Sequence, residues 1–436
     1  MRFTSRLFLV AGAVLSLSAC DSFFDRVPET SIGQDEVYTD ATGAEAAING
    51  VYNSIQDVMT DYLIFSELAA DEAQHTGSYP SWLEVDTNNL SISNAEASGQ
   101  WIGWYEVVNN ANNVIAFVQG TPGLSEERSD EIQGEAYAAR AYAYHALVRW
   151  FGDVPLVLDP TVDLSNVEVS RTAAGQVYDQ IITDLETAQG LVAESQSVGL
   201  IDRDVVRGLL ARVLLYDGQY QRAGQIASEL ADAYPLVSLE ALYDNLNSTE
   251  SIWELQFTSD DSNSLAFFAF ATGSGGRREY GPTLEFPTLF TEEDARYDYN
   301  LVDQGGTLVF NKYYRVATGT DHEFLVRGGE MVLIAAEAAA RSGDVGTAVG
   351  LVNEIRERAG AEPVDAGTVS SGAAALDLVL AERRIELALE GHRWHDLNRT
   401  GRAVSELELD SPNQTLWPIP ERDLNVNPNL QQNPGY

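Results

Sequence analysis

Residues 204–234 read DVVRGLLARVLLYDGQYQRAGQIASELADAY, and this stretch decides the fold. Apolar side chains recur at helical spacing from Leu209 to Tyr216, and a second apolar stripe runs from Ala223 to Ala231. The Asp-Gly-Gln-Tyr segment between them is typical of a turn, and Pro235 ends the second stripe. Two short helices around a glycine turn, with small alanines at the crossing, resemble the roughly 34-residue tetratricopeptide unit.

The same pattern recurs elsewhere in the chain. Residues 330–359 repeat it around a Ser-Gly-Asp turn, and three amphipathic helices are expected over 41–58, 97–118 and 129–151. We expect Ser129 or Asp130 to cap the last of these helices and Gly152 to end it. Because one helix pair cannot bury its own apolar face, several pairs must stack. The sequence therefore predicts a mostly α-helical, right-handed scaffold of tetratricopeptide-like helix pairs with long insertions.

Two insertions differ from the helices in composition. Residues 70–94 and 248–327 are rich in Gly, Ser, Asn, Asp and aromatic residues, with strand-like segments at 251–257 and 308–314. Long structured loops on a rigid scaffold are common places for binding sites. We therefore look for ligand-binding residues in these two insertions.

The composition excludes several functional classes. The 436 residues carry 26 Lys and Arg against 66 Asp and Glu, a formal net charge of −40, so the surface would repel nucleic acid. Lys312 is the single lysine, a bias that fits either adaptation to high salt or GC-rich codon usage. The single cysteine, Cys20, excludes a disulfide framework and a thiolate zinc site.

The first 20 residues predict where the protein is held. Arg2 and Arg6 precede an apolar run that is too short to span a bilayer but suits a signal peptide over residues 1–19. The Leu-Ser-Ala-Cys sequence ending at Cys20 looks like a lipobox, in which cleavage leaves a lipid-bearing cysteine as the new N-terminus. The alternative is a small core cysteine. We expect the protein to reach the membrane by its lipid anchor alone, because no other segment is long and apolar enough to cross it.

Motifs along most of the chain resemble those of the SusD/RagB family of outer-membrane nutrient-binding lipoproteins. They include Trp101 with Tyr105, ARAY at 139–142, FGDVPL at 151–156, LARV at 210–213, LIAAEA at 333–338, VNEIRERAG at 352–360, ERRIEL at 382–387, WPIP at 417–420 and QNPGY at 432–436.

The resemblance implies a fold, a place and a partner. Residues 20–436 would form one SusD-like unit, with an N-terminal helical part at 20–247, an insertion at 248–327 and a signature part at 328–436. The protein would be exposed on the outer membrane as a mobile lid over a SusC-like TonB-dependent transporter, to which it delivers an oligosaccharide. Members of the family also serve peptide uptake, so a peptide ligand stays open. No cofactor and no catalytic residue is implied.

Two loop clusters have the composition of a glycan site. The C–H faces of sugars pack on aromatic rings, and their hydroxyl groups need planar polar partners. Both clusters combine such residues: His75, Tyr79, Trp82, Asp86 and Asn88 in the first, and Arg277, Arg278, Glu279 and Tyr280 in the second. Trp101, Trp104 and Trp394 are assigned to the core.

The acidic residues near the C-terminus leave an enzyme open as an alternative. Glu382, Arg383, Glu386, Glu390 and Arg393 alternate in sign at helical spacing, which predicts a network of paired charges rather than a glycosidase acid and nucleophile. His392 and His395 lack a clear third ligand, so no metal site is expected. The alternatives to a glycan-binding protein are a surface glycosidase or peptidase and a protein-interaction scaffold.

Overall fold

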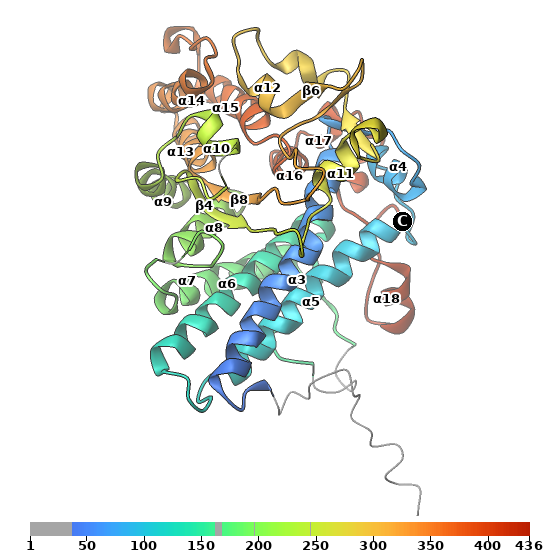
Figure 1. Cartoon of the computed structure of the whole chain (residues 1–436), viewed down its shortest axis with the longest axis vertical. Coiled ribbons are helices and arrows are strands. Elements are labelled where there is room, and N and C mark those ends of the chain that lie inside the picture. The colour runs from blue at the N-terminus through green and yellow to red at the C-terminus, as the bar shows by residue number, and fades with distance from the viewer. Residues whose placement is uncertain (1–36, 162–167, 196, 245) are drawn as a thin grey trace, which may run out of the picture.

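The computed structural model describes residues 37–161, 168–195, 197–244 and 246–436 (Figure 1). The expected signal peptide and Cys20 lie outside these residues. Helices dominate the described chain and its strands are short, which confirms the mostly α-helical fold class.

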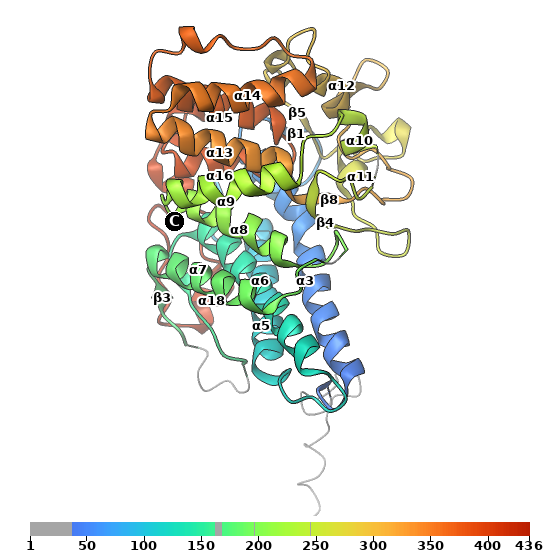
Figure 2. The same ribbon diagram turned by 90° about the vertical axis from the view of Figure 1, so that its left-hand side faces the viewer.

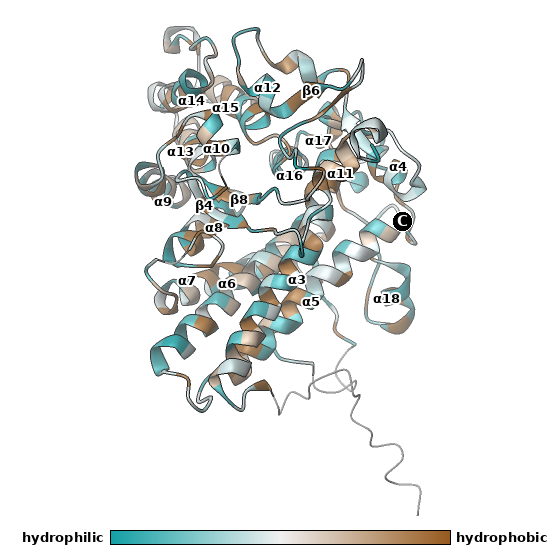
Figure 3. Ribbon diagram, in the orientation of Figure 1, coloured by the Kyte–Doolittle hydropathy of each residue, from teal (hydrophilic) through white to brown (hydrophobic). Residues whose placement is uncertain are grey.

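Three long helices form the N-terminal part of the scaffold: α3 (Ala41–Leu68), α5 (Ala95–Phe117) and α6 (Glu126–Phe151). They lie side by side in both ribbon views (Figures 1 and 2). Apolar and polar residues alternate around their turns (Figure 3), but the C-terminal halves of α3 and α6 are buried on nearly all sides.

Helix α6 begins earlier than the sequence suggested. Ser125, rather than Ser129 or Asp130, accepts a hydrogen bond from the amide of Arg128 and caps the helix. The end is as expected, because Gly152 adopts a φ of 71° that most other residues avoid.

The expected helix pairs are present. Helices α8 (Arg203–Tyr216) and α9 (Tyr220–Ala233) form one hairpin, and α13 (Gly328–Ser342) and α14 (Val345–Ala359) form another. Helix α9 packs against α13 although more than 90 residues separate them, so the second hairpin stacks on the first (Figure 2).

Small residues permit this stacking. A Cβ atom on Gly224 of α9 would lie only 2.5 Å from the Cβ of Ala338 in α13. Across the same interface, Arg212 donates to both carboxylate oxygens of the buried Glu330 at 2.5 and 2.6 Å. A close crossing and a buried ion pair therefore join the two hairpins.

The remaining helices are shorter or lie at the ends of the scaffold. They are α4 (Pro80–Asp86), α7 (Ala174–Leu191), α10 (Leu239–Tyr243), α11 (Leu265–Ala269), α12 (Arg296–Asn300), α15 (Gly372–Glu386), α16 (Arg393–Arg399), α17 (Ala403–Glu406) and α18 (Glu421–Val426). Helix α7 packs on α6, where Asp184 accepts two hydrogen bonds from Arg140, both at 2.8 Å.

The described strands form four antiparallel pairs. They are β1 (Ala73–His75) with β5 (Tyr280–Pro282), β2 (Val154–Pro155) with β3 (Arg171–Thr172), β4 (Ser251–Leu255) with β8 (Glu323–Arg327), and β6 (Leu301–Asp303) with β7 (Leu308–Phe310). The two strands expected from the sequence exist as β4 and β7, and both are shorter than expected.

The core runs through the helical scaffold. Trp101, Trp104 and Trp394 are at most 4% exposed, which confirms their assignment to the core. Within the residues that the structure describes, no helix combines the length and apolar character needed to cross a membrane.

Candidate functional site

The two loop clusters identified in the sequence meet in space. Strand β1 pairs with β5, and His75 lies opposite Tyr280 in the register. The amide of Thr76 extends the pairing by donating to the carbonyl of Glu279 at 2.9 Å. Two segments about 200 residues apart therefore form one two-stranded ribbon, which brings the candidate residues of both insertions together.

Glu279 organises the loop that follows β1. Its buried carboxylate accepts hydrogen bonds from the amides of Ser78 at 2.6 Å and Tyr79 at 3.3 Å, and from Nε of Arg277 at 2.5 Å. Burial alone would raise the pKa of Glu279, but these donors hold it below its ordinary value. The charged carboxylate thus fixes Tyr79 and Arg277 relative to each other.

Tyr79 and Arg277 form a stacked pair at the surface. The guanidinium carbon of Arg277 lies 4.2 Å from the ring centroid of Tyr79, and the Arg277 side chain is 41% exposed. Beneath this pair, Trp82 lies 5.5 Å from the Tyr79 ring and 5.1 Å from the Phe268 ring, measured between centroids.

Two further apolar side chains, from α4 and α11, reach solvent. Phe267 is 40% exposed and packs edge-on against Phe268, and Leu83 on α4 is 49% exposed. We call the group of Tyr79, Leu83, Phe267, Arg277 and Arg278 the ribbon site. It combines apolar surface and the Arg277 guanidinium, which lies on the Tyr79 ring, with the Arg278 guanidinium, whose Nη2 lies beside Gly281 of β5.

Besides Glu279, three of the candidate ligand-binding residues are buried. Trp82 is 4% exposed, Asn88 5% and Tyr280 3%. Trp82 and Tyr280 pack into the aromatic core next to Phe65 and Phe310. The sequence predicted that their rings would contact a ligand, but both rings are covered by the protein itself. Their side chains support the ribbon site from below.

Asn88 has a structural position at the end of α4. Its φ of 49° is one that asparagine tolerates better than most residues, and its side-chain amide donates to the carbonyl of Ala69 at 3.0 Å. This hydrogen bond joins the end of α4 to the end of α3. The buried Asn88 is therefore not placed to contact a ligand.

His75 and Asp86 lie at the edge of the ribbon. The His75 side chain is 9% exposed, and its Nε2 lies 3.6 Å from a carboxylate oxygen of Glu279. Burial raises the pKa of Asp86, although His75 acts against this shift. Among the candidates, Arg277 is exposed, and His75, Tyr79, Asp86 and Arg278 are partly exposed.

Phe267, Phe268 and Leu83 were not among the candidate residues expected from the sequence. A signal was present in the Leu-Ala-Phe-Phe-Ala-Phe run at 265–270, because consecutive phenylalanines in a polar insertion cannot all point inward from a short helix. Only the structure shows that α11 brings this run over Trp82.

The C-terminal acidic residues form the expected charge network. Glu386 lies 2.5 Å from Arg358, 2.6 Å from Arg327 and 3.2 Å from Arg296. Glu390 pairs with Arg327 at 2.8 Å and with Lys312 at 2.7 Å. Although burial opposes it, these cations hold the pKa of Glu386 and of Glu390 below the ordinary value. Such carboxylates stay ionised and bound to arginine, which suits a structural role.

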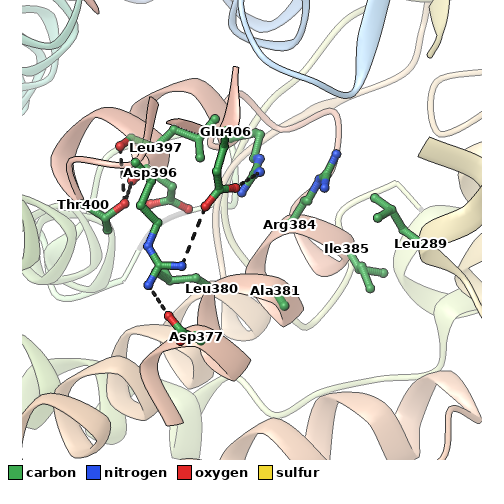
Figure 4. A pocket seen from close by; sticks show the side chains of 12 residues that line it. Leu289, Asp377, Leu380, Ala381, Arg384, Ile385, Asp396, Leu397, Thr400 and Glu406 are labelled. Carbon is green, nitrogen blue, oxygen red and sulfur yellow. Dashed lines mark hydrogen bonds and ion pairs between the residues drawn. The ribbon is translucent and has the colours of Figure 1, made fainter. Parts of the chain in front are cut away.

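A cavity of about 300 Å³ lies between α15, α16 and α17 (Figure 4). Its arginines already pair with carboxylates: Arg393 with Glu406 at 2.8 Å, Arg402 with Asp377, and Arg384 with Glu285, outside the cavity lining, at 3.2 Å. A ligand would have to displace these pairs, so the cavity is a poorer candidate than the ribbon site.

The two C-terminal histidines are buried in the aromatic core. The His395 ring stacks on Tyr62 with centroids 5.5 Å apart, and burial lowers the pKa of both His392 and His395. In the described part of the chain, no three His, Cys, Asp or Glu side chains are grouped so that they could hold a metal ion.

Two family models match the chain. One, described as starch-binding and associating with the outer membrane, matches residues 23–215, and the other, described as the SusD family, matches residues 308–415. These descriptions agree with the expectation of a carbohydrate-binding protein that is not an enzyme.

Individual relatives cover almost the whole chain. The SusD-like protein P38 of Formosa agariphila is 26% identical over 98% of this chain and 98% of its own. Among solved structures, a SusD superfamily protein from Bacteroides vulgatus superposes with a TM-score of 0.82 at 20% identity, covering 92% of this chain and 100% of its own. A laminarin-binding SusD-like protein gives a TM-score of 0.79 at 24% identity, with coverage of 92% and 100%.

Proposed function

Because the chain belongs to the SusD family, we propose that it captures a glycan at the cell surface and delivers it to a SusC-like TonB-dependent transporter. The protein acts by binding alone. The ligand leaves chemically unchanged, and the transporter carries it across the outer membrane.

The observation that carries this proposal is the ribbon site. Its exposed Phe267 ring, its half-buried Tyr79 ring and the Arg277 guanidinium, which lies 4.2 Å from the Tyr79 centroid, match the C–H groups and hydroxyl groups of a sugar. A ring packs on sugar C–H groups, while a guanidinium donates to pairs of hydroxyl oxygens. The family description as starch-binding and the laminarin-binding relative support the same ligand class.

The architecture of the site suits reversible capture. The Glu279 carboxylate and the buried Trp82 hold Tyr79 and Arg277 in place before any ligand arrives, so little side-chain ordering is needed on binding. Because Tyr79 is half-buried, only part of its ring is open to a sugar, which favours the modest affinity that release to a transporter requires.

The anchor places this site at the membrane. We propose that signal-peptide cleavage before Cys20 leaves a lipid-modified cysteine, and that the lipid alone retains the protein. The Cys20→Ala variant should then fractionate as a soluble protein in cells that lack the transporter. A variant that stays in the outer-membrane fraction would contradict this mode of attachment.

The binding site is tested with a matched pair of variants. Phe267 in the ribbon site and Phe117 at the end of α5 are 40% and 39% exposed, and both are contacted by another aromatic ring. Calorimetry against the polysaccharide that the wild-type protein binds best should show at least about ten-fold weaker binding for Tyr79→Ala and for Phe267→Ala, and no change for Phe117→Ala. Equal losses in Phe267→Ala and Phe117→Ala would contradict the site.

The transporter is tested by co-purification. A tagged wild-type protein, extracted in mild detergent from its native membrane, should retain a β-barrel transporter of the TonB-dependent class. Retention of no such barrel would contradict delivery while leaving glycan binding in place.

A further inference from the structure

Arg278 in the ribbon site differs from every other described cation. Among the residues that the structure describes, all but three arginines have a carboxylate oxygen within 4 Å, and so does Lys312. The three exceptions are Arg149, Arg171 and Arg278.

Two of these exceptions are satisfied in other ways. The Arg149 guanidinium lies 5.5 Å from the ring centroids of both Tyr62 and Tyr216, and its Nε donates to the carbonyl of His145. Arg171 donates to three backbone carbonyls and to Oδ1 of Asn433. These guanidinium groups have protein partners.

The Arg278 guanidinium has none among the described residues. Its Nε is buried without a hydrogen-bond partner, and the side chain makes no ion pair or ring contact there. The nearby Glu279 carboxylate cannot supply one, because Arg277 and the amides of Ser78 and Tyr79 already occupy it. In a chain with 66 acidic residues, a partly buried arginine without an acceptor requires an explanation.

The backbone at Arg278 is also unusual. Its φ is 54°, in the left-handed region that a long side chain rarely adopts. The hydroxyl of Thr76 donates to the Arg278 carbonyl at 3.0 Å and holds this conformation across the ribbon. The conformation directs Nη2 over Gly281 of β5, where it lies 3.7 Å from the position a Cβ atom would take.

Two unfavourable features thus coincide at one residue of the candidate site: an unmatched guanidinium and a strained backbone. Such features persist at binding sites, where the ligand supplies the missing partner. A guanidinium without a counter-charge is best matched by a planar or tetrahedral oxyanion, which accepts two parallel N–H bonds.

We propose that Arg278 binds an anionic substituent, a uronate carboxylate or a sulfate ester, so that the ligand of the ribbon site is an acidic polysaccharide. This inference rests on the proposed function. Tyr79 and Phe267 pack on the sugar faces, Arg277 stays paired with Glu279, and Arg278 supplies the selection for charge.

The test compares polysaccharides that differ in charge. Alginate and polygalacturonate carry carboxylates, carrageenan and fucoidan carry sulfates, and laminarin and starch are neutral. Binding is measured by affinity electrophoresis and calorimetry in 0.5 M NaCl, where a Debye length of about 4 Å screens the general repulsion from the acidic protein. We expect at least one acidic polymer to bind at least ten-fold more tightly than both neutral ones, and its type identifies the carboxylate or the sulfate.

Matched variants connect this preference to one residue. Arg278→Gln should weaken binding of the acidic polymer at least ten-fold, to the level of its carboxyl-reduced or desulfated form, without changing the affinity for that neutral form. Arg422→Gln is the control, because Arg422 is 67% exposed and lies far along the chain on α18. It should leave binding unchanged.

The outcomes separate the two proposals. Tight binding of a neutral polymer that depends on Tyr79 but not on Arg278 would overturn the acidic ligand and keep the glycan site. Equal losses of affinity in Arg278→Gln and Arg422→Gln would also overturn the acidic ligand, because they would show that any surface arginine contributes through its charge alone. If none of the six polymers binds, both proposals are contradicted.

Discussion

Arginines in two regions of this molecule have opposite surroundings. In the core, Arg327 lies 3.0 Å from Glu250, 2.6 Å from Glu386 and 2.8 Å from Glu390, and is 1% exposed. At the ribbon site, Arg278 is partly exposed and meets no described acceptor. The same side chain thus stabilises the fold where its partners belong to the protein, and is left available for a ligand where they do not.

The core network explains why the C-terminal motif is so rich in charge. The carboxylates of Glu386 and Glu390, at the end of α15, join α14 and the insertion through the Arg358 and Arg327 guanidinium groups that converge on them. Buried charges of this kind are stable only as a complete set, because each ion that loses its partner keeps the cost of its desolvation. Removing an arginine from the core network should therefore cost much more stability than removing Arg278 from the ribbon site.

The largest effect is expected at the centre of the core network. Arg327→Met leaves Glu250, Glu386 and Glu390 buried with fewer cations, and should lower the free energy of unfolding by about 3–5 kcal/mol. Urea denaturation followed by circular dichroism measures this loss. The matched Arg278→Met variant should change stability by less than about 1 kcal/mol. Similar losses in both variants would remove the distinction between the two regions.

Trp82 tests the boundary between core and site. Trp82→Ala removes a 4% exposed ring that contacts Phe65, Tyr79 and Phe268, and should cost about 3–5 kcal/mol of unfolding free energy. Tyr79→Ala should cost less than about 1 kcal/mol while losing glycan affinity. Thermal unfolding of the two variants shows which ring stabilises the core and which one serves mainly to bind the ligand. An unchanged melting temperature for Trp82→Ala would show that its ring belongs to the binding surface.

A buried carboxylate that has no cation beside it should make the stability of the protein depend on pH. Glu323 on β8 is 0% exposed and accepts a hydrogen bond from Thr60 at 2.5 Å. Burial raises its pKa to about 8, with the Thr60 hydroxyl opposing and Asp61 adding to the shift. The folded state therefore binds this proton more tightly than the unfolded state, and the stability it contributes is lost as pH rises from about 5 through 8.

Glu323→Gln should remove this pH dependence. The amide cannot ionise, so the variant should exceed the wild-type protein in unfolding free energy by about 2–4 kcal/mol at pH 9 and differ little at pH 5. Urea titrations of both proteins across this pH range measure the difference between their unfolding free energies. Other titrating groups contribute equally to both proteins, so their contributions cancel. If the difference between the two unfolding free energies does not grow with pH, the raised pKa of Glu323 is contradicted.

The smallest effect is expected at Arg278 itself. Asparagine tolerates a φ of 54° better than arginine, so Arg278→Asn should keep or raise stability, by up to about 1 kcal/mol, while losing the anionic ligand. Arg277→Asn is the matched control, because it breaks the 2.5 Å contact with Glu279 and should lower stability slightly. A clear loss of stability in Arg278→Asn would show that the side chain serves the fold.

The sequence was sufficient for the helices and not for the site. Apolar periodicity predicted the hairpins from α8 to α9 and from α13 to α14, because a buried helix face repeats locally along the chain. Alternating charge likewise predicted the network around Glu386. Both the helix pairs and the charge network can be predicted because they depend on the spacing of nearby residues.

The ribbon site depends on contacts that spacing does not encode. Strands β1 and β5 are three residues each and lie about 200 residues apart, so no local pattern indicated that they pair. The residue types near Tyr79 and Arg277 could be recognised, but the burial of Trp82 follows from Phe65 and Phe268, which come from α3 and α11. Residue type identified the region, and long-range packing decided which side chains face solvent.

A crystal structure of the protein with the polysaccharide fragment that binds it best would show whether the ligand lies at the ribbon site. We expect sugar rings packed on Tyr79 and Phe267, with an anionic oxygen within about 3 Å of the Arg278 guanidinium. A fragment bound instead in the cavity between α15 and α17, with Arg278 still unpaired, would contradict this expectation.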